Sequence, residues 1–176
     1  MWITQLAFDA DCVAYAHDAA HDPARPNGTG ADTVLAESLL SLVEHAAVDV
    51  RILLNASALL NTARALGEYV RRALAARAPV AGRVAVRGVR RFPNFLHVKM
   101  VIVDGAEGFL LGSPFVNSYW DTPRHHPVDT RRPTRELGGR PLHDVSVRLT
   151  GDAVRHLEAC FVELWNASGA TEGGDA

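Results

Sequence analysis

Cysteine, aromatic residues and long apolar runs are all scarce in this 176-residue sequence. The two cysteines, Cys12 and Cys160, match no metal-ligand or thioredoxin-like spacing, so we expect reduced core residues rather than a disulfide scaffold. No apolar run approaches the roughly 20 residues that span a bilayer, and the start at Met1 lacks the basic residues of a signal peptide. These absences predict a cytoplasmic protein.

Charge of one sign is not in excess either. Eighteen Lys and Arg residues face twenty Asp and Glu residues, which gives a net charge of −2 at pH 7. No overall basic field therefore exists to hold nucleic acid or an anionic membrane, and any anion must be bound by a local group of residues. The hydrophobic share of 48% is ordinary for one globular domain with a single core.

Apolar patterns predict strands that alternate with helices. A turn at Asp104-Gly105 is expected to join two strands into a hairpin. Together these signals predict an α/β (α+β) fold, with a mixed β-sheet flanked by helices, over residues 1–166 and a disordered polar tail over 167–176. The expected strands cover 2–8, 48–54, 83–89, 96–103, 109–111 and 145–149, and the expected helices begin near Asp32 or Thr33, near Asn55 or Ser57, and at Gly151-Asp152.

One predicted strand carries two polar residues in apolar surroundings. Strand alternation places His97 and Lys99 on one face, roughly 6.5–7 Å apart along the strand, while Val98, Met100 and Ile102 point into the core. A buried ammonium is costly unless an anion accompanies it, and one phosphate could contact both polar side chains. Asp104 falls on the opposite face at the end of the strand, where we expect it to fix the turn.

The pattern H-x-K-x4-D at residues 97–104, followed by Gly112-Ser113, resembles the HKD signature of the phospholipase D superfamily. Members of that superfamily cleave or transfer phosphodiesters through a phosphohistidine. The resemblance covers nearly the whole chain, and the order of its motifs is similar to one half of a bacterial phospholipid-cleaving enzyme. The further matching segments are V-D-V-R-I-L-L at 48–54, Y-W-D-T-P-R-H at 119–125, R-P-L-H-D-V at 140–145, L-T-G-D-A-V at 149–154 and F-x-x-x-W at 161–165.

The resemblance implies a role for each matching residue. It makes His97 the nucleophile or its acid partner, Lys99 a ligand of the phosphate oxygens, and Asp144 the carboxylate that orients the histidine. It also implies a close approach at Gly112, a structural role for Asp104, and phosphate binding by Ser113 and Asn117. No metal and no cofactor are expected.

In-line displacement at phosphorus needs two histidines, because one imidazole cannot both attack and protonate the leaving group on the opposite side. This chain carries a single HKD motif, so we expect a homodimer whose two motifs converge on one phosphate. The alternatives are a second HKD-bearing chain, a part of a longer protein that the sequence lacks, or an acid supplied in cis by His125, His126 or His143.

We therefore expect a phosphodiesterase that hydrolyses or transfers phosphatidyl groups. One alternative is a small homodimeric nuclease, against which the net charge of −2 argues. Another is an inactive phosphodiester-binding or pairing half. Two departures from the family pattern favour it. Seven residues separate Asp104 from Gly112, one more than in the family, and Gly-Ser-Pro-Phe replaces Gly-Ser-x-Asn, which displaces Asn117.

Two loops remain open to interpretation. The loop over residues 121–140 holds five arginines and three acidic residues. It is either a solvated surface or a rim that gives peripheral membrane contact through anionic headgroups. His17 and His21, with Asp18 and Asp22 beside them, are assigned to a polar loop rather than to a metal site.

Overall fold

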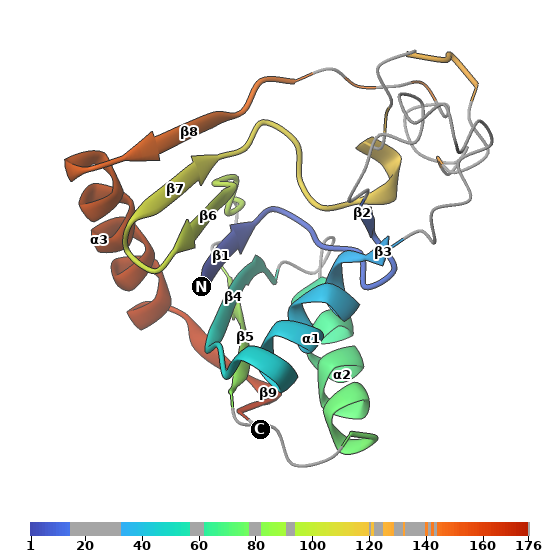
Figure 1. Cartoon of the computed structure of the whole chain (residues 1–176), viewed down its shortest axis with the longest axis vertical. Helices are drawn as coiled ribbons and strands as arrows, with labels where there is room; N and C mark the ends of the chain where they lie inside the picture. The colour runs from blue at the N-terminus through green and yellow to red at the C-terminus, as the bar shows by residue number, and fades with distance from the viewer. Residues whose placement is uncertain are drawn as a thin grey trace.

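The computed structural model shows a layered domain (Figure 1). It describes residues 1–14, 33–56, 62–77, 82–90, 94–119 and 144–175, together with residues 121, 125–128, 132, 140 and 142. A mixed β-sheet lies between helices α1 (Leu35–Ala46) and α2 (Thr62–Ala75) on one face and α3 (Asp152–Asn166) on the other. The prediction of an α/β fold with a mixed sheet is confirmed. None of the helices in the described ranges is long and apolar enough to cross a membrane.

The sheet combines a parallel centre with antiparallel strands on both sides. Its order in the described residues is β8-β7-β6-β1-β4-β5-β9, with β1, β4 and β5 parallel and the other neighbours antiparallel. A separate ladder pairs β2 with β3. The strands are β1 (Trp2–Gln5), β2 (Val13–Ala14), β3 (Thr33–Val34), β4 (Val50–Asn55), β5 (Val84–Val89), β6 (Met100–Val103), β7 (Glu107–Leu110), β8 (Val147–Thr150) and β9 (Gly169–Asp175).

Each face of the sheet buries its own apolar core. On one face Ile52 of β4 packs with Leu40 of α1 and Leu66 of α2. On the other face Met100 of β6 packs with Phe161 of α3. Strand alternation explains the division, because residues two apart along a strand point to the same face. Met100 and Ile102 are buried in this second core, and Val98 packs against it, so the expectation that these three residues point into the core is confirmed.

Stacked aromatic rings hold α3 against the sheet. The ring of Phe161 stacks on that of Trp2 at 5.0 Å and on that of Trp165 at 5.6 Å. The guanidinium of Arg87 in β5 lies 4.4 Å from the Trp165 ring centroid, which is a cation-π contact. Trp165 is buried in the core on this face of the sheet.

The first two helices begin differently from the prediction. Helix α1 starts at Leu35 with Val34 as its N-cap and no side-chain cap, because Thr33 and Val34 are extended and pair with β2. Neither Asp32, which lies outside the described residues, nor Thr33 therefore serves as the cap. Asn55 ends β4 rather than capping α2, and Ser57 also lies outside the described residues.

The polar tail differs as well. We expect no structure beyond residue 166, yet residues Gly169–Asp175 form β9, antiparallel to β5. The expectation fails because β5 would otherwise expose a row of unpaired backbone groups, and pairing with such an edge needs an extended backbone rather than apolar side chains.

The two cysteines have different surroundings. Cys12 is buried, and this burial, with the nearby carboxylates of Asp9 and Asp11, raises the pKa of its thiol to about 12. It is therefore an unreactive core residue, as expected. Cys160 is exposed on α3, so the expectation of a second buried cysteine is wrong. Helical periodicity explains the error, because position 160 falls outside the apolar stripe of Val154 and Phe161.

Candidate active site

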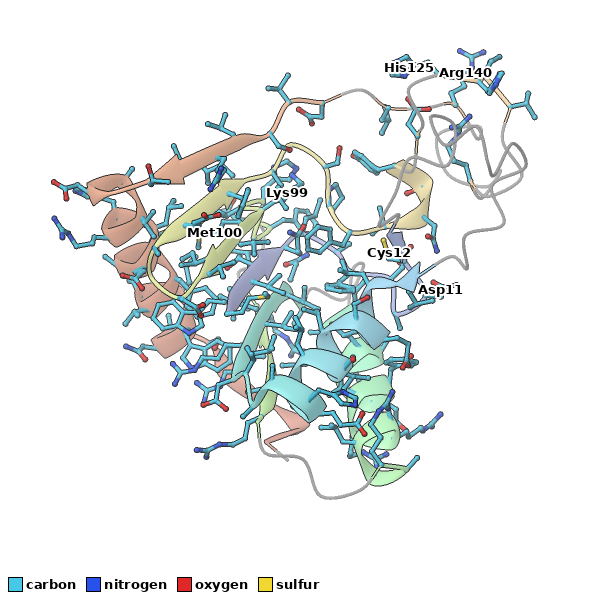
Figure 2. All side chains as sticks on the ribbon, viewed as in Figure 1. Asp11, Cys12, Lys99, Met100, His125 and Arg140 are labelled. Atoms are coloured by element: carbon cyan, nitrogen blue, oxygen red, sulfur yellow. The ribbon has the colours of Figure 1, made fainter. Side chains whose placement is uncertain are left out.

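His97 and Lys99 lie at the edge of the sheet where β1 and β4 end. They belong to the irregular segment 94–99 before β6, so the strand expected over 96–103 is shorter than predicted. Strand pairing continues for one residue, because the Leu111 N–H donates to the Lys99 carbonyl at 2.9 Å. The carboxyl ends of parallel strands are where ligands bind in open α/β sheets. Figure 2 shows Lys99 at the open end of the β6–β7 hairpin, away from the turn that joins the two strands.

Lys99 is a buried cation that forms no close ion pair with the described residues. Its side chain is 8% exposed. The ammonium donates to the His97 carbonyl at 3.4 Å and lies 3.5 Å from His97 Nδ1. Burial lowers the pKa of Lys99 from its ordinary value of 10.5, and the Asp144 carboxylate acts in the opposite direction. An ammonium with such weak partners has donors left that an anion could use.

The contact with Lys99 bears on the tautomer of His97, whose side chain is exposed. An ammonium has only donors, so Nδ1 can accept from it only when Nδ1 is unprotonated, and a neutral ring then carries its proton on Nε2. A general acid must be an imidazolium, which carries protons on both ring nitrogens, because a neutral imidazole does not give up its remaining proton at ordinary pH. To attack phosphorus, Nε2 must be unprotonated while Nδ1 carries the proton. Both roles therefore require Lys99 to leave Nδ1.

Asp144 and Gly112 are in direct contact. A Cβ on Gly112 would lie 2.2 Å from Asp144 Cγ and Oδ1, which is far inside van der Waals distance. Asp144 Oδ1 accepts from the Val145 N–H at 2.8 Å, and no hydrogen bond joins Asp144 to His97. The missing side chain at Gly112 thus leaves room for Asp144, whose carboxylate lies within electrostatic range of Lys99.

We expect Gly112→Ala to displace Asp144 and to lower phosphodiester turnover about tenfold, with a loss of about 1 kcal/mol in unfolding free energy from the steric conflict. Gly67→Ala is the matched control, since a Cβ at this α2 position meets only Val86 Cβ at 3.9 Å. It should raise the unfolding free energy by about 0.5–1 kcal/mol and leave turnover unchanged. Urea titrations and initial rates measure both, and an unchanged rate for Gly112→Ala would contradict a role for the contact.

The proposed phosphate ligands Ser113 and Asn117 lie in different surroundings. Ser113 directly follows Gly112 and is half-buried. Asn117 lies in the short helix η1 (Asn117–Tyr119), where its backbone N–H donates to Asp9 at 3.0 Å and its amide Nδ2 donates to Asp11 Oδ1 at 3.1 Å. Figure 2 shows Asp11 well separated from Lys99. The amide of Asn117 is thus engaged away from the His97–Lys99 pair.

Asp104 lies at the opposite end of the hairpin. Its φ is 51° and that of Gly105 is 64°, and the Ala106 N–H donates to the Val103 carbonyl at 3.0 Å. This geometry is the type I′ turn that Asp-Gly favours, so the turn predicted there is confirmed. Asp104 consequently lies about one strand length away from His97 and Lys99.

The described part of the loop over residues 121–140 also lies away from Lys99, as the positions of His125 and Arg140 in Figure 2 show. His125 Nδ1 lies 2.5 Å from Asp121 Oδ2. Arg132 is 2% exposed, pairs with Asp121 at 3.4 Å and donates to the His126 carbonyl, so it is a structural cation rather than part of an exposed rim. Arg140 is exposed.

The remaining histidines of interest, His17, His21 and His143, lie outside the described residues. Within the described ranges, no group of three or more His, Cys, Asp or Glu side chains could hold a metal ion.

Two polar residues that the sequence analysis did not single out lie on β1. Thr4 and Gln5 are wholly buried, and the Thr4 hydroxyl and both amide atoms of Gln5 have no hydrogen-bond partner among the described residues. Each such group costs about 1–3 kcal/mol. The available signal is the occurrence of Thr-Gln within the otherwise apolar run W-I-T-Q-L-A-F.

No family model matches the sequence, and no curated protein matches it. Any functional conclusion therefore depends on the motifs and on the geometry at this edge of the sheet.

Proposed function

We propose that the protein is a phospholipase D-like phosphodiesterase that hydrolyses or transfers phosphatidyl groups through a phosphohistidine. The active form is a homodimer in which His97 and Lys99 of both subunits meet at one phosphate. The observation that carries the proposal is Lys99, a residue that is 8% exposed and whose ammonium lies 3.5 Å from Nδ1 of the exposed His97. A buried cation beside an accessible imidazole is suited to an anion that also reacts with that imidazole.

Lysine composition supports the proposal. Lys99 is the one lysine in the sequence, and the other seventeen basic residues are arginines. Lysine provides a compact point charge that one phosphate oxygen can approach, whereas the guanidinium of arginine is planar and favours bidentate contacts. The single lysine therefore occurs at the position where the proposed chemistry needs such a charge.

The reaction has two steps. His97 Nε2 of one subunit attacks phosphorus, the bond to the headgroup oxygen breaks, and the His97 imidazolium of the partner protonates that oxygen from Nε2. Water or an alcohol then attacks phosphorus, gives its proton to the now neutral partner imidazole, and breaks the bond between Nε2 and phosphorus. The two Lys99 ammonium groups stabilise the charge on the nonbridging oxygens in both steps.

Exposed apolar side chains beside the polar residues favour a lipid substrate. Phe95 lies two residues before His97 and is 44% exposed, and Val145 follows Asp144 and is 71% exposed. Apolar surface next to a phosphate site suits a phosphate attached to a glycerolipid, whereas a nucleic-acid backbone would favour additional cations. The resemblance of the 119–125 and 140–145 segments to lipid-cleaving enzymes points to the same substrate class.

One observation favours the inactive alternative, a pairing or phosphodiester-binding half. The Asn117 amide donates to Asp11 rather than lying beside Lys99, and the departure from Gly-Ser-x-Asn is what displaces it. This alternative predicts binding of phosphodiesters without turnover.

The test combines size measurement with trapping of the intermediate. The purified protein is sized by chromatography and incubated with phosphatidylcholine vesicles or single-stranded DNA, with and without EDTA. We expect a dimer that releases choline from the vesicles, is unaffected by EDTA, and retains phosphorus label from phosphatidylcholine after quenching in SDS. Turnover of DNA alone would instead establish the nuclease, and binding without turnover the inactive half. Loss of turnover in EDTA would contradict the scheme.

A further inference from the structure

Gln5 is the most unusual buried residue near the candidate site. Its side chain is wholly buried at the end of β1, and neither Oε1 nor Nε2 has a hydrogen-bond partner among the described residues. A buried amide without partners is unfavourable, because it has lost its hydrogen bonds to water. A leucine would fill similar space without this cost, so the amide needs a reason other than packing.

The register of β1 and β6 points to Gln5 as the neighbour of Lys99 across the sheet. These antiparallel strands pair Trp2 with Ile102, Ile3 with Val101 and Thr4 with Met100, where the ladder ends. Continued by one residue, the same register sets Gln5 opposite Lys99, and directly opposite residues of a ladder project from the same face with Cβ atoms about 4.5–5.5 Å apart. The amide of Gln5 and the ammonium of Lys99 therefore share one face of the sheet, where the ammonium has only the weak contacts to His97.

We propose that Gln5 is a positioning residue for Lys99, whose amide oxygen accepts a hydrogen bond from the ammonium when Lys99 leaves His97 Nδ1 to bind phosphate. The proposal rests on the function proposed above. It answers the requirement that Nδ1 be free to carry a proton before Nε2 can attack. A neutral amide suits this task, because it orients the ammonium without neutralising it, whereas a carboxylate would compete with the phosphate.

Thr4 provides a matched control. It is also wholly buried with an unpartnered hydroxyl, but it pairs with Met100 and so faces the opposite side of the sheet, towards α3. Thr4→Val and Gln5→Leu both remove a buried polar group without a partner. A purely structural role predicts that both variants keep or gain stability and otherwise behave alike.

The experiment uses the single lysine as a probe. Lysine labelled with ¹⁵N gives one side-chain signal, from Lys99, in the full-length protein, and its pH titration reports the pKa of the ammonium. Phosphate and vanadate binding are measured by calorimetry, and stability by urea unfolding. For Gln5→Leu we expect stability unchanged or higher, a lower pKa of Lys99 when the titration is run with bound phosphate, at least tenfold weaker anion binding, and a correspondingly lower kcat. For Gln5→Glu we expect a higher pKa of Lys99 and weakened anion binding. Thr4→Val should match the wild type in all but stability.

The outcomes separate this inference from the proposed function. If Gln5→Leu and Thr4→Val both leave the Lys99 titration and anion binding unchanged, Gln5 does not position Lys99, whatever the enzyme does. If the wild-type protein turns over neither phosphatidylcholine nor DNA but Gln5→Leu still shifts the titration and weakens anion binding, the positioning role stands and the proposed catalysis fails.

Discussion

The His97→Asn variant is expected to lose at least about 10⁴-fold in phosphodiester turnover, because the same imidazole is the nucleophile in one subunit and the acid in the other. Asparagine can form no phosphoramidate intermediate at this position and donates no titratable proton. Choline release from phosphatidylcholine and retention of phosphorus label on the protein measure the loss. His156→Asn is the control, since His156 is exposed on α3 and its ring contacts the Asp152 carbonyl. This control should retain full turnover and the label.

Mixing the variant with the wild type tests whether two subunits share one site. If each active centre needs His97 from both subunits, random exchange leaves the activity proportional to the square of the wild-type fraction. A site completed within one chain, for example by a loop histidine, gives a linear dependence instead. The linear result would contradict the shared site while leaving His97 as the nucleophile.

Much of the sheet could be predicted because its signals are local. Alternating apolar residues locate β4, β5 and the hairpin, and Asp104-Gly105 has the residue types that a type I′ turn requires. The tail could not be predicted in this way. Strand β9 forms by backbone pairing with β5, and such pairing leaves no apolar pattern in a segment that reads G-A-T-E-G-G-D.

The candidate site is predictable only in part, for a similar reason. A spacing of two residues within one segment brings His97 and Lys99 together, whereas the contact of Gly112 with Asp144 joins segments that are distant in the sequence and is not predicted. Gln5 lies more than ninety residues away in the chain, and only the register of β1 with β6 places it opposite Lys99. A non-local register cannot be read from the periodicity of either segment alone.

Replacing Lys99 with Met is expected to abolish turnover almost completely, by about 10³-fold, while raising the unfolding free energy by about 1 kcal/mol. Lys99 supplies the positive charge for the phosphate oxygens, and Met removes this charge but keeps the apolar length of the side chain. Stability rises because the wild-type protein holds a buried ammonium that forms no close ion pair with the described residues. A loss of turnover together with a gain in unfolding free energy distinguishes a functional cation from a structural one.

The pH dependence of stability gives the same variant a second readout. Burial lowers the pKa of Lys99 in the folded protein below the ordinary value of 10.5, so the unfolded chain binds more protons between the folded pKa and 10.5. The unfavourable free energy of burying the charged ammonium is present in full below the folded pKa, and it is lost as the pH rises through that pKa. We therefore expect the wild-type protein to gain stability relative to Lys99→Met on the alkaline side, approaching pH 10.5. Parallel stability curves, or a loss of stability in Lys99→Met at neutral pH, would show that the ammonium is already satisfied in the free protein and is not held ready for an anion.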